Sequence, residues 1–324
     1  MMRMRIIRPA AQSIGDYRPE TLRRRLRRDE IHRVYRGAYV EIASDAWESL
    51  APTTQHVARA IGAVGASETA VVCGISAAAI HGLPLLNSRL SGPVTVNRSS
   101  ASPPVAGLQV MRSRLKDADT VEMYGLKVTT LERTIQDLAS LVSGHELLAA
   151  ADAALRFGAN FDALDEPLRH RCTLRWMKTH ASDRAESYAE SWSRYLMIEH
   201  GVEFDLQQAT ILDDNGEFLA RTDFASRAGV LGEFDGRIKY GKLLAPGEDA
   251  VAAVIAEKQR EARLRAAGWE MVRWMWSDLQ HPQKFIRMLE RGFERARTLP
   301  APRGHVVLDP VRPPQQPDWS FLME

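Results

Sequence analysis

Hydrophobic and polar positions in the first 48 residues predict a short helix followed by a hairpin. Leu22 and Leu26 lie one turn apart in a segment that begins just after Pro19, so a helix over 20–28 places both leucines on one face. Residues 31–42 then alternate between apolar and polar side chains around Arg36-Gly37, which predicts a tight β-hairpin. Residues 1–48 therefore form a first small unit.

The next stretch, 49–160, has the pattern of a mixed α/β domain. Short strands are expected at 93–96, 108–112 and 126–128. An alanine-rich helix over 76–81 precedes them and stops at Gly82. Thr129 or Thr130 caps a following helix that runs to Leu141, and another helix is expected over 144–156. Residues 161–181 lack clear periodicity and are interpreted as a junction.

A separate series of elements follows over 182–297. Three strands are expected at 206–212, 218–225 and 230–235, with Asp213-Asp214-Asn215-Gly216 as a turn signal between the first two. The expected helices and last strand are 183–200, 249–267, 269–274 and 278–295. The resulting order is α-β-β-β-α-β-α. The segment 298–324 holds six of the sixteen prolines and is expected to be an extended or disordered tail, and whether its Trp319 packs on a domain stays open.

Composition narrows the class of protein. The 324 residues suggest about two domains, and 45% hydrophobic with 26% charged residues is ordinary for a globular α/β protein of several domains. No run of about 18 apolar residues predicts a membrane span, and the N-terminus lacks the apolar segment of a secretory signal. Cys73 and Cys172 are too few for a disulfide framework or a cysteine-rich zinc site, so we expect a cytoplasmic protein.

The net charge of +2 hides an uneven distribution. Residues 1–40 carry eleven arginines and four acidic residues, a local charge of +7, while the rest of the chain sums to −5. A basic helix followed by a hairpin is typical of a winged-helix unit that contacts DNA, and a solvated arginine face is the alternative. The expected DNA-binding residues are Arg23, Arg24, Arg25, Arg27, Arg28, Arg33 and Arg36.

Acidic residues gather in the predicted C-terminal domain. Asp223 lies near the end of one strand, and Glu233 and Asp235 are two residues apart, so they share a face of the next strand. Glu186 and Glu190, four residues apart, share one helix face upstream. Converging carboxylates need a cation, and oxygen ligands suit Mg²⁺ or Mn²⁺.

Such an ion could activate water for phosphodiester hydrolysis, with a lysine neutralising developing charge. The expected metal ligands are Asp223, Glu233 and Asp235. Glu190 completes or flanks the catalytic site, and Lys239 and Lys258 are the candidate lysines. The alternative is that these carboxylates are strand-end and turn residues that face water. The sequence contains no phosphate-binding loop, dinucleotide-binding glycine motif or nucleophile elbow.

The segment 182–297 resembles the PD-(D/E)XK nuclease superfamily, in the branch related to very-short-patch repair endonucleases that occurs in uncharacterised actinobacterial proteins. The resemblance is carried by Glu190-Ser191 with Arg194, Gln207, Arg221-Thr222-Asp223-Phe224, Glu233-Phe234-Asp235-Gly236, and Glu257 to Leu264 leading into Gly268-Trp269 and Val272-Arg273. It implies a restriction-endonuclease-like αβββαβ core, with Asp223 at the first acidic position and Glu233 at the second. Asp235 replaces the usual lysine, as in this branch. Lys239 replaces the branch's common histidine, so it either supplies the missing cation or marks an altered site.

The first half of the chain resembles AbiEi-type antitoxins of type IV toxin–antitoxin systems. The resemblance is carried by His32-Arg33-Val34-Tyr35-Arg36-Gly37-Ala38-Tyr39, Gly74-Ile75-Ser76-Ala77-Ala78, His81-Gly82-Leu83, Val128-Thr129-Thr130 and Arg133-Thr134-Ile135-Gln136-Asp137-Leu138. It implies a winged-helix reader, a middle α/β domain and a cognate toxin as a further partner. Only about sixteen residues precede the basic helix, where a full winged helix has two helices. The expected contact is therefore with phosphates.

Two functions compete. The first is a Mg²⁺- or Mn²⁺-dependent endonuclease in which the basic N-terminal unit holds DNA and the C-terminal domain cuts it. The second is a non-catalytic, antitoxin-like DNA-binding regulator that uses the nuclease fold as a scaffold. We favour the enzyme because the carboxylate set is more intact than decay would leave.

Overall fold

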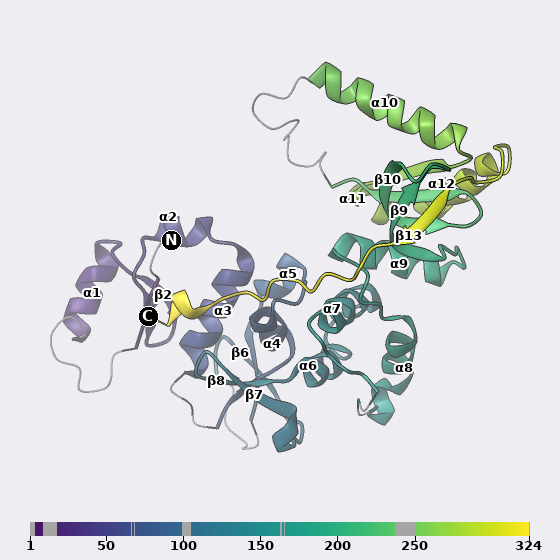
Figure 1. Cartoon of the computed structure of the whole chain (residues 1–324). Coiled ribbons are helices and arrows are strands. Elements are labelled where there is room, and N and C mark those ends of the chain that lie inside the picture. Colours follow the sequence, from purple (N-terminus) through teal and green to yellow (C-terminus); the bar gives the residue numbers. More distant parts are fainter. Residues whose placement is uncertain are drawn as a thin grey trace. The chain divides into compact units, whose positions relative to one another are not determined.

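The computed structural model describes residues 4–8, 18–65, 67, 69–98, 105–162, 164, 166–236 and 250–323, with backbone only for 250–257. These residues form a mixed α/β protein with twelve α-helices and three sheets, which confirms the predicted class. Contacts divide the chain into two compact units, Met1–Ala181 with Pro314–Glu324 and Ser182–Pro313 (Figure 1). In the described residues, no helix combines the length and apolar character that a membrane span needs.

The first unit begins with the small basic region. Its sheet has the order β1-β3-β2 and is antiparallel, and its helices flank the hairpin. The elements are β1 (Ile6–Ile7), α1 (Pro19–Arg27), β2 (His32–Tyr35), β3 (Ala38–Val40), α2 (Ser44–Ser49) and α3 (Pro52–Val64). Gly37 joins β2 to β3 with a φ of +75°, a left-handed conformation that other residues adopt reluctantly. The Arg36-Gly37 turn signal therefore marks the hairpin.

A five-stranded mixed sheet with the order β6-β5-β4-β8-β7 forms the rest of this unit. Its strands are β4 (Val71–Val72), β5 (Val94–Asn97), β6 (Leu108–Met111), β7 (Thr120–Met123) and β8 (Leu126–Thr129). The accompanying helices are α4 (Gly74–His81), α5 (Asn87–Leu90), α6 (Leu131–Leu138), α7 (Gly144–Arg156) and α8 (Arg171–His180). Thr130 is the residue that caps α6, because its hydroxyl accepts a hydrogen bond from the N–H of Arg133 at 3.3 Å.

Two segments of this unit are more ordered than the sequence predicted. The expected junction contains helix α8, whose Leu174 and Met177 are fully buried in the core that α6 and α7 share. The proline-rich tail returns to the same unit: Trp319 is buried, and its indole N–H donates to the carbonyl of Ile80 at 2.9 Å. In both segments the order comes from contacts with distant parts of the chain.

The second unit has a five-stranded sheet with the order β12-β11-β10-β9-β13. Only β11 and β12 pair in parallel, because helix α10 connects them as a crossover. The strands are β9 (Leu206–Leu212), β10 (Phe218–Ser226), β11 (Val230–Phe234), β12 (Glu270–Trp274) and β13 (His305–Leu308). The helices are α9 (Tyr188–Glu199), α10 (Ala250–Ala266), α11 (Trp276–Leu279) and α12 (Pro282–Ala296). The predicted α-β-β-β-α-β-α order is thus present, with β13 added from the tail.

Helices cover both faces of this sheet (Figure 1). On one face, α9 and α12 share a core with the fully buried Trp274 and Phe224. On the other face, Leu264 of α10 packs with Leu231 of β11. A Cβ at Gly232 would lie 2.7 Å from the Trp274 ring, so only glycine lets this ring pack against β11. The two layers of helices leave the ends of the strands as the place for a site.

Two helix boundaries in this unit differ from the prediction. The helix expected from 183 begins at Tyr188, because Ser182 and Arg184 hydrogen-bond instead to Gln207 and to the carbonyl of Asp309. The final predicted helix is two helices, α11 and α12, which are separated at Gln280 and His281, before Pro282 begins the second.

Candidate active site and nucleic-acid interface

Two acidic residues face each other across neighbouring strands. The antiparallel register pairs Phe224 of β10 with Gly232 of β11, which places Asp223 directly opposite Glu233. Opposite residues in a sheet present their side chains on the same face. The backbone N–H of Phe234 also donates to Asp223 Oδ2 at 2.8 Å, so the carboxylate is held against β11.

Glu190 reaches this region from the first turn of α9. Ser187 caps the helix by accepting from the N–H of Glu190 at 3.2 Å, and its hydroxyl donates to Glu190 Oε1 at 2.7 Å. Glu190 Oε2 accepts from the N–H of Glu186 at 2.7 Å and from Gln208 Nε2 at 2.8 Å. This arrangement is a reciprocal cap that stabilises the start of the helix and fixes the carboxylate beside β9.

Negative charge is in excess around these two groups. Burial, and then the charge of Asp223, raises the pKa of Glu190 to about 7 in spite of the three hydrogen bonds that its carboxylate accepts from neutral groups. The pKa of Asp223 is raised as well, first by burial and then by the charge of Glu233. Buried carboxylates with raised pKa values are typical of sites that bind a cation or exchange a proton.

The third carboxylate, Glu233, is paired with two arginines. Arg273 Nε donates to Glu233 Oε2 at 2.9 Å, and Arg260 of α10 approaches the same carboxylate at 3.3 and 3.4 Å. Arg273 also binds Glu261 on α10. The parallel register places Arg273 directly opposite Glu233. The protein's own cations therefore surround the carboxylate that was predicted to bind a metal.

The remaining predicted catalytic residues are less closely grouped. Asp235 follows β11 and is half-buried, and its N–H donates to the carbonyl of Trp274 at 2.8 Å. Lys258 is exposed on α10, two residues or about 200° of helix rotation away from Arg260, so it points away from Glu233. Lys239 lies outside the described residues. Glu186 pairs with Arg221 at 2.8 Å, and Arg221 in turn binds Asp309 at 2.5 Å.

A metal site is not yet assembled from this set. In the part of the chain that the structure describes, no group of three or more His, Cys, Asp or Glu side chains is arranged to hold a metal ion. The donor chemistry fits in part: Asp223 and Glu233 offer oxygen ligands side by side, but the Glu233 oxygens are engaged by arginines. A bound cation would have to take the place of those arginine contacts.

Sequence reasoning missed three residues that shape the site: Gln208, Arg260 and Arg273. Gln208 has a φ of +52° and is buried, which turns its amide towards Glu190. Arg260 lies among other charged residues of α10, so its residue type alone does not distinguish a site residue from an ordinary helix ion pair. The position of Arg273 depends on the parallel pairing of β12 with β11, and no local pattern sets that register.

Seven N-terminal arginines are the residues predicted to contact DNA. Six of the seven are exposed on α1 and the hairpin: Arg23, Arg24, Arg27, Arg28, Arg33 and Arg36. The seventh, Arg25, is half-buried and pairs with Glu41 at 2.9 Å and Glu30 at 3.5 Å. Leu22 is buried and orients α1 on the unit. The face is therefore rich in solvated guanidinium groups, and Arg25 serves mainly to hold it in place.

The chain was also compared with known proteins. No protein-family model, no curated protein and no solved structure matches it.

Proposed function

We propose that this protein is a Mg²⁺- or Mn²⁺-dependent nuclease that acts on DNA, with a restriction-endonuclease-like second unit. The observation that carries the proposal is the meeting of Glu190, Asp223 and Glu233 from α9, β10 and β11. Two of these carboxylates have raised pKa values, first because they are buried and then because a neighbouring carboxylate carries negative charge. A divalent cation is the partner that would remove this repulsion.

In this proposal Asp223, Glu233 and Asp235 hold the ion. The ion would supply Lewis-acid stabilisation of the phosphodiester and lower the pKa of a bound water. Glu190 positions the site, since Gln208 links its carboxylate to the strand next to Asp223. Arg260 takes the electrostatic role that the sequence suggested for Lys258, because Arg260 is the residue of α10 that contacts Glu233.

The first unit supplies the grip on the substrate. Six exposed arginines on α1 and the β2–β3 hairpin fit a row of phosphates, and such contacts bind without reading sequence. DNA is the expected nucleic acid because a basic helix followed by a hairpin suits the width of its major groove.

One observation favours the second candidate, a non-catalytic DNA-binding regulator. Arg273 and Arg260 both contact Glu233, so the second acidic position is neutralised by the protein itself. In a regulator those ion pairs would be permanent, and the unit would serve as a scaffold that takes up no metal. The two candidates therefore differ in whether Glu233 exchanges its arginines for a cation.

A cleavage assay separates the two candidates. Supercoiled plasmid, single-stranded DNA and RNA are incubated with the full chain and Mg²⁺ or Mn²⁺. We expect metal-dependent cutting of DNA that falls at least about 100-fold in Asp223→Asn and in Glu233→Gln, since each removes charge that the metal needs. Asp214→Asn is the matched control, because Asp214 is exposed in the β9–β10 turn.

Undiminished cutting by both site variants would sink the assigned site. Absence of cutting, together with salt-dependent DNA binding in the absence of metal, would favour the regulator. Binding is measured by gel mobility with Arg23→Ala/Arg24→Ala/Arg27→Ala, which should weaken it in either candidate.

A further inference from the structure

The first unit contains a cavity that the proposed nuclease does not use. It has a volume of about 700 Å³. Its walls come from the segment 111–119 that follows β6, from α6, and from the segment 166–170 that precedes α8. This volume is in the range of pockets that bind small molecules and cofactors.

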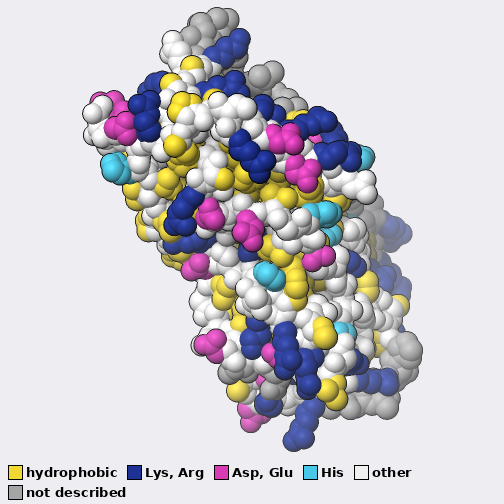
Figure 2. Space-filling model, turned by 90° about the vertical axis from the view of Figure 1, so that its right-hand side faces the viewer, with side chains coloured by type: hydrophobic (Ala, Val, Ile, Leu, Met, Phe, Trp, Pro, Cys, Tyr) yellow, Lys and Arg dark blue, Asp and Glu magenta, His cyan; other side chains and the backbone are white. Residues whose placement is uncertain are grey.

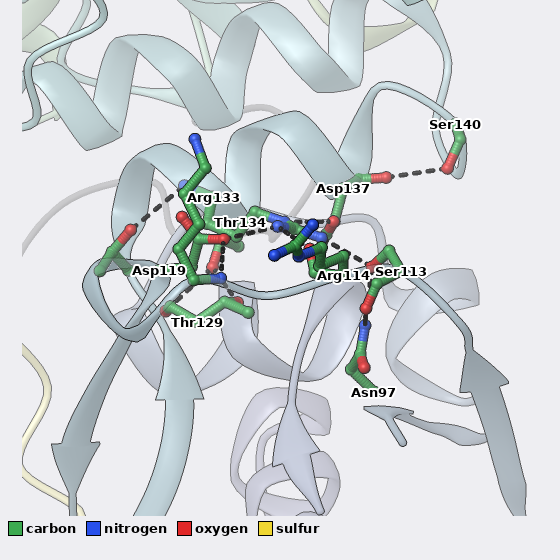
Figure 3. A network of polar contacts seen from close by, with 11 residues as sticks. Asn97, Ser113, Arg114, Asp119, Thr129, Arg133, Thr134, Asp137 and Ser140 are labelled. Carbon is green, nitrogen blue, oxygen red and sulfur yellow. Dashed lines mark hydrogen bonds and ion pairs between the residues drawn. The ribbon is translucent and has the colours of Figure 1, made fainter. Parts of the chain in front are cut away.

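The floor of the cavity is a buried ion network around Arg133 of α6 (Figure 3). Arg133 Nε donates to Asp137 at 3.0 Å, and Nη1 donates to Asp119 at 2.8 Å. Arg133 is 7% exposed, so these contacts are shielded from water. Arg133 is therefore the cation beside both carboxylates of the floor, and burial still raises the pKa of Asp137.

The third carboxylate of the cavity wall is matched as well. Glu166 binds Arg175 at 2.8 Å and Lys178 at 3.4 Å, both on α8. The hydrogen bond and charge of Arg175, and then those of Lys178, lower the pKa of Glu166 and keep it charged. Each carboxylate of the cavity lining therefore has a cation beside it, although Asp119 and Asp137 share the one guanidinium of Arg133.

Hydrogen-bond donors, in contrast, are available in the cavity. The Ser113 hydroxyl oxygen accepts from Asn97 Nδ2 at 2.7 Å and from Arg133 Nη2 at 2.6 Å (Figure 3). Both lone pairs of a hydroxyl oxygen are then in use, so its proton is left to donate to something else. Ser113 is half-buried in the cavity wall, where a bound molecule can accept that proton.

Two arginines complete the set of donors. Arg114 and Arg169 line the cavity and are exposed, and within the described residues neither takes part in an ion pair. Figure 2 shows Lys and Arg side chains gathered in the lower part of the view. Two guanidinium groups and one hydroxyl proton thus face one cavity.

We infer that this cavity binds a phosphate-bearing small molecule of about nucleotide size. A phosphate monoester offers several oxygens and close to two negative charges, which suits two guanidinium groups and a hydroxyl donor. The Gln136 amide in the same wall, which can donate and accept, is available to the rest of the molecule. A carboxylate group carries one charge on two oxygens, so even a dicarboxylate does not present three oxygens and nearly two charges at one point.

Binding is tested by isothermal titration of the full chain, without divalent metal, at low salt. The probes are AMP, ribose 5-phosphate, adenosine and succinate. We expect AMP and ribose 5-phosphate to bind and the other two not to. Arg114→Ala/Arg169→Ala should weaken phosphate binding at least tenfold, and Arg169→Glu should abolish it. The matched control is Arg112→Ala, an exposed arginine two residues from Arg114 that does not line the cavity.

Four outcomes would overturn the inference. They are no binding of either phosphate at millimolar concentration, equal binding of adenosine, equal binding of succinate, and unchanged affinity in both arginine variants. Equal loss in Arg112→Ala would show a diffuse charge effect and would overturn it too. Circular dichroism checks that each variant is folded. All three variants change exposed side chains only.

Discussion

The Arg133 network of the first unit and the carboxylate cluster of the second unit are both buried and polar, but they balance charge differently. In the first unit Asp119 and Asp137 each meet the guanidinium of Arg133, at 2.8 and 3.0 Å. In the second unit Glu190 meets only neutral donors, from Ser187, Gln208 and the Glu186 backbone.

In both regions burial raises the pKa of a carboxylate, with a counter-charge beside it at Asp137 and without one at Glu190. Glu190 accepts several short hydrogen bonds, yet its pKa is raised to about 7, because burial and the charge of Asp223 outweigh them. Asp119 and Asp137 have Arg133 as their counter-charge. Glu190 has only neutral donors, so a proton or a cation is what would balance its charge.

The largest effect on stability is expected when the Arg133 network is broken. Arg133→Met keeps much of the side-chain volume but leaves Asp119 and Asp137 without their cation in a buried place. We expect a loss of about 3–5 kcal/mol in the free energy of unfolding, the usual effect of removing one partner of a buried ion pair. Urea denaturation at pH 7 measures it.

The control for this experiment is Arg114→Met, which removes an exposed arginine from the adjacent wall and should change stability by less than about 0.5 kcal/mol. If Arg133→Met lost no more than its control, the network would not be a stabilising element, and the contrast between the two regions would disappear.

The second effect concerns the pH dependence that Glu190 imposes. Its folded-state pKa of about 7 lies above the ordinary value of 4.5, so the folded protein binds more protons than the unfolded chain between these values. Stability therefore falls as pH rises from about 4.5 to 7, by up to about 3 kcal/mol, and is level above that. Glu190→Gln should remove this dependence.

The difference between wild type and Glu190→Gln isolates this effect, since His56, with a pKa lowered to about 4, has the opposite sign and is present in both. Glutamine can keep the geometry: its carbonyl accepts from Glu186 and Gln208, and its amide donates to Ser187. Urea denaturation from pH 4.5 to 8 gives both curves. Parallel curves would show that folding does not raise the pKa of Glu190.

The sequence predicted much of this cluster because its signals are local. The strands expected at 206–212 and 218–225, with the turn signal at 213–216, predicted the β9–β10 hairpin, and both strands appear within one residue of the predicted bounds. The spacing of Asp223 and Glu233 then suggested that they converge. The two residues lie opposite each other because β10 and β11 also pair as neighbouring antiparallel strands.

What the sequence did not predict depends on distant pairing. Arg273 meets Glu233 only because β12 joins β11 in parallel after a crossover helix. Arg133 meets its partners Asp119 and Ser113 only in the folded chain, since they lie 14 and 20 residues upstream. Trp319 hydrogen-bonds to Ile80, which lies 239 residues earlier in the chain. Such contacts are decided by the packing of whole elements, which residue spacing does not encode.

The smallest stability effect, and the sharpest test of the carboxylate cluster, is expected from Arg260→Gln. Arg260 is half-buried and approaches Glu233 at 3.3 and 3.4 Å, while Arg273 stays in place at 2.9 Å. A weak pair with a remaining second cation should contribute less than about 1 kcal/mol. Its removal should tighten Mn²⁺ binding several-fold, because one competitor for the Glu233 carboxylate is gone.

Mn²⁺ titration followed by electron paramagnetic resonance measures this affinity in wild type, Arg260→Gln and Lys258→Gln. Lys258→Gln removes the same charge from the same helix but on a face that points away from Glu233. If the two variants tighten Mn²⁺ binding equally, the effect is a general change in charge. If Arg260→Gln weakens binding, the arginine supports the ion instead of competing with it. Tighter Mn²⁺ binding in Arg260→Gln alone means that Arg260 and the cation compete for the Glu233 carboxylate.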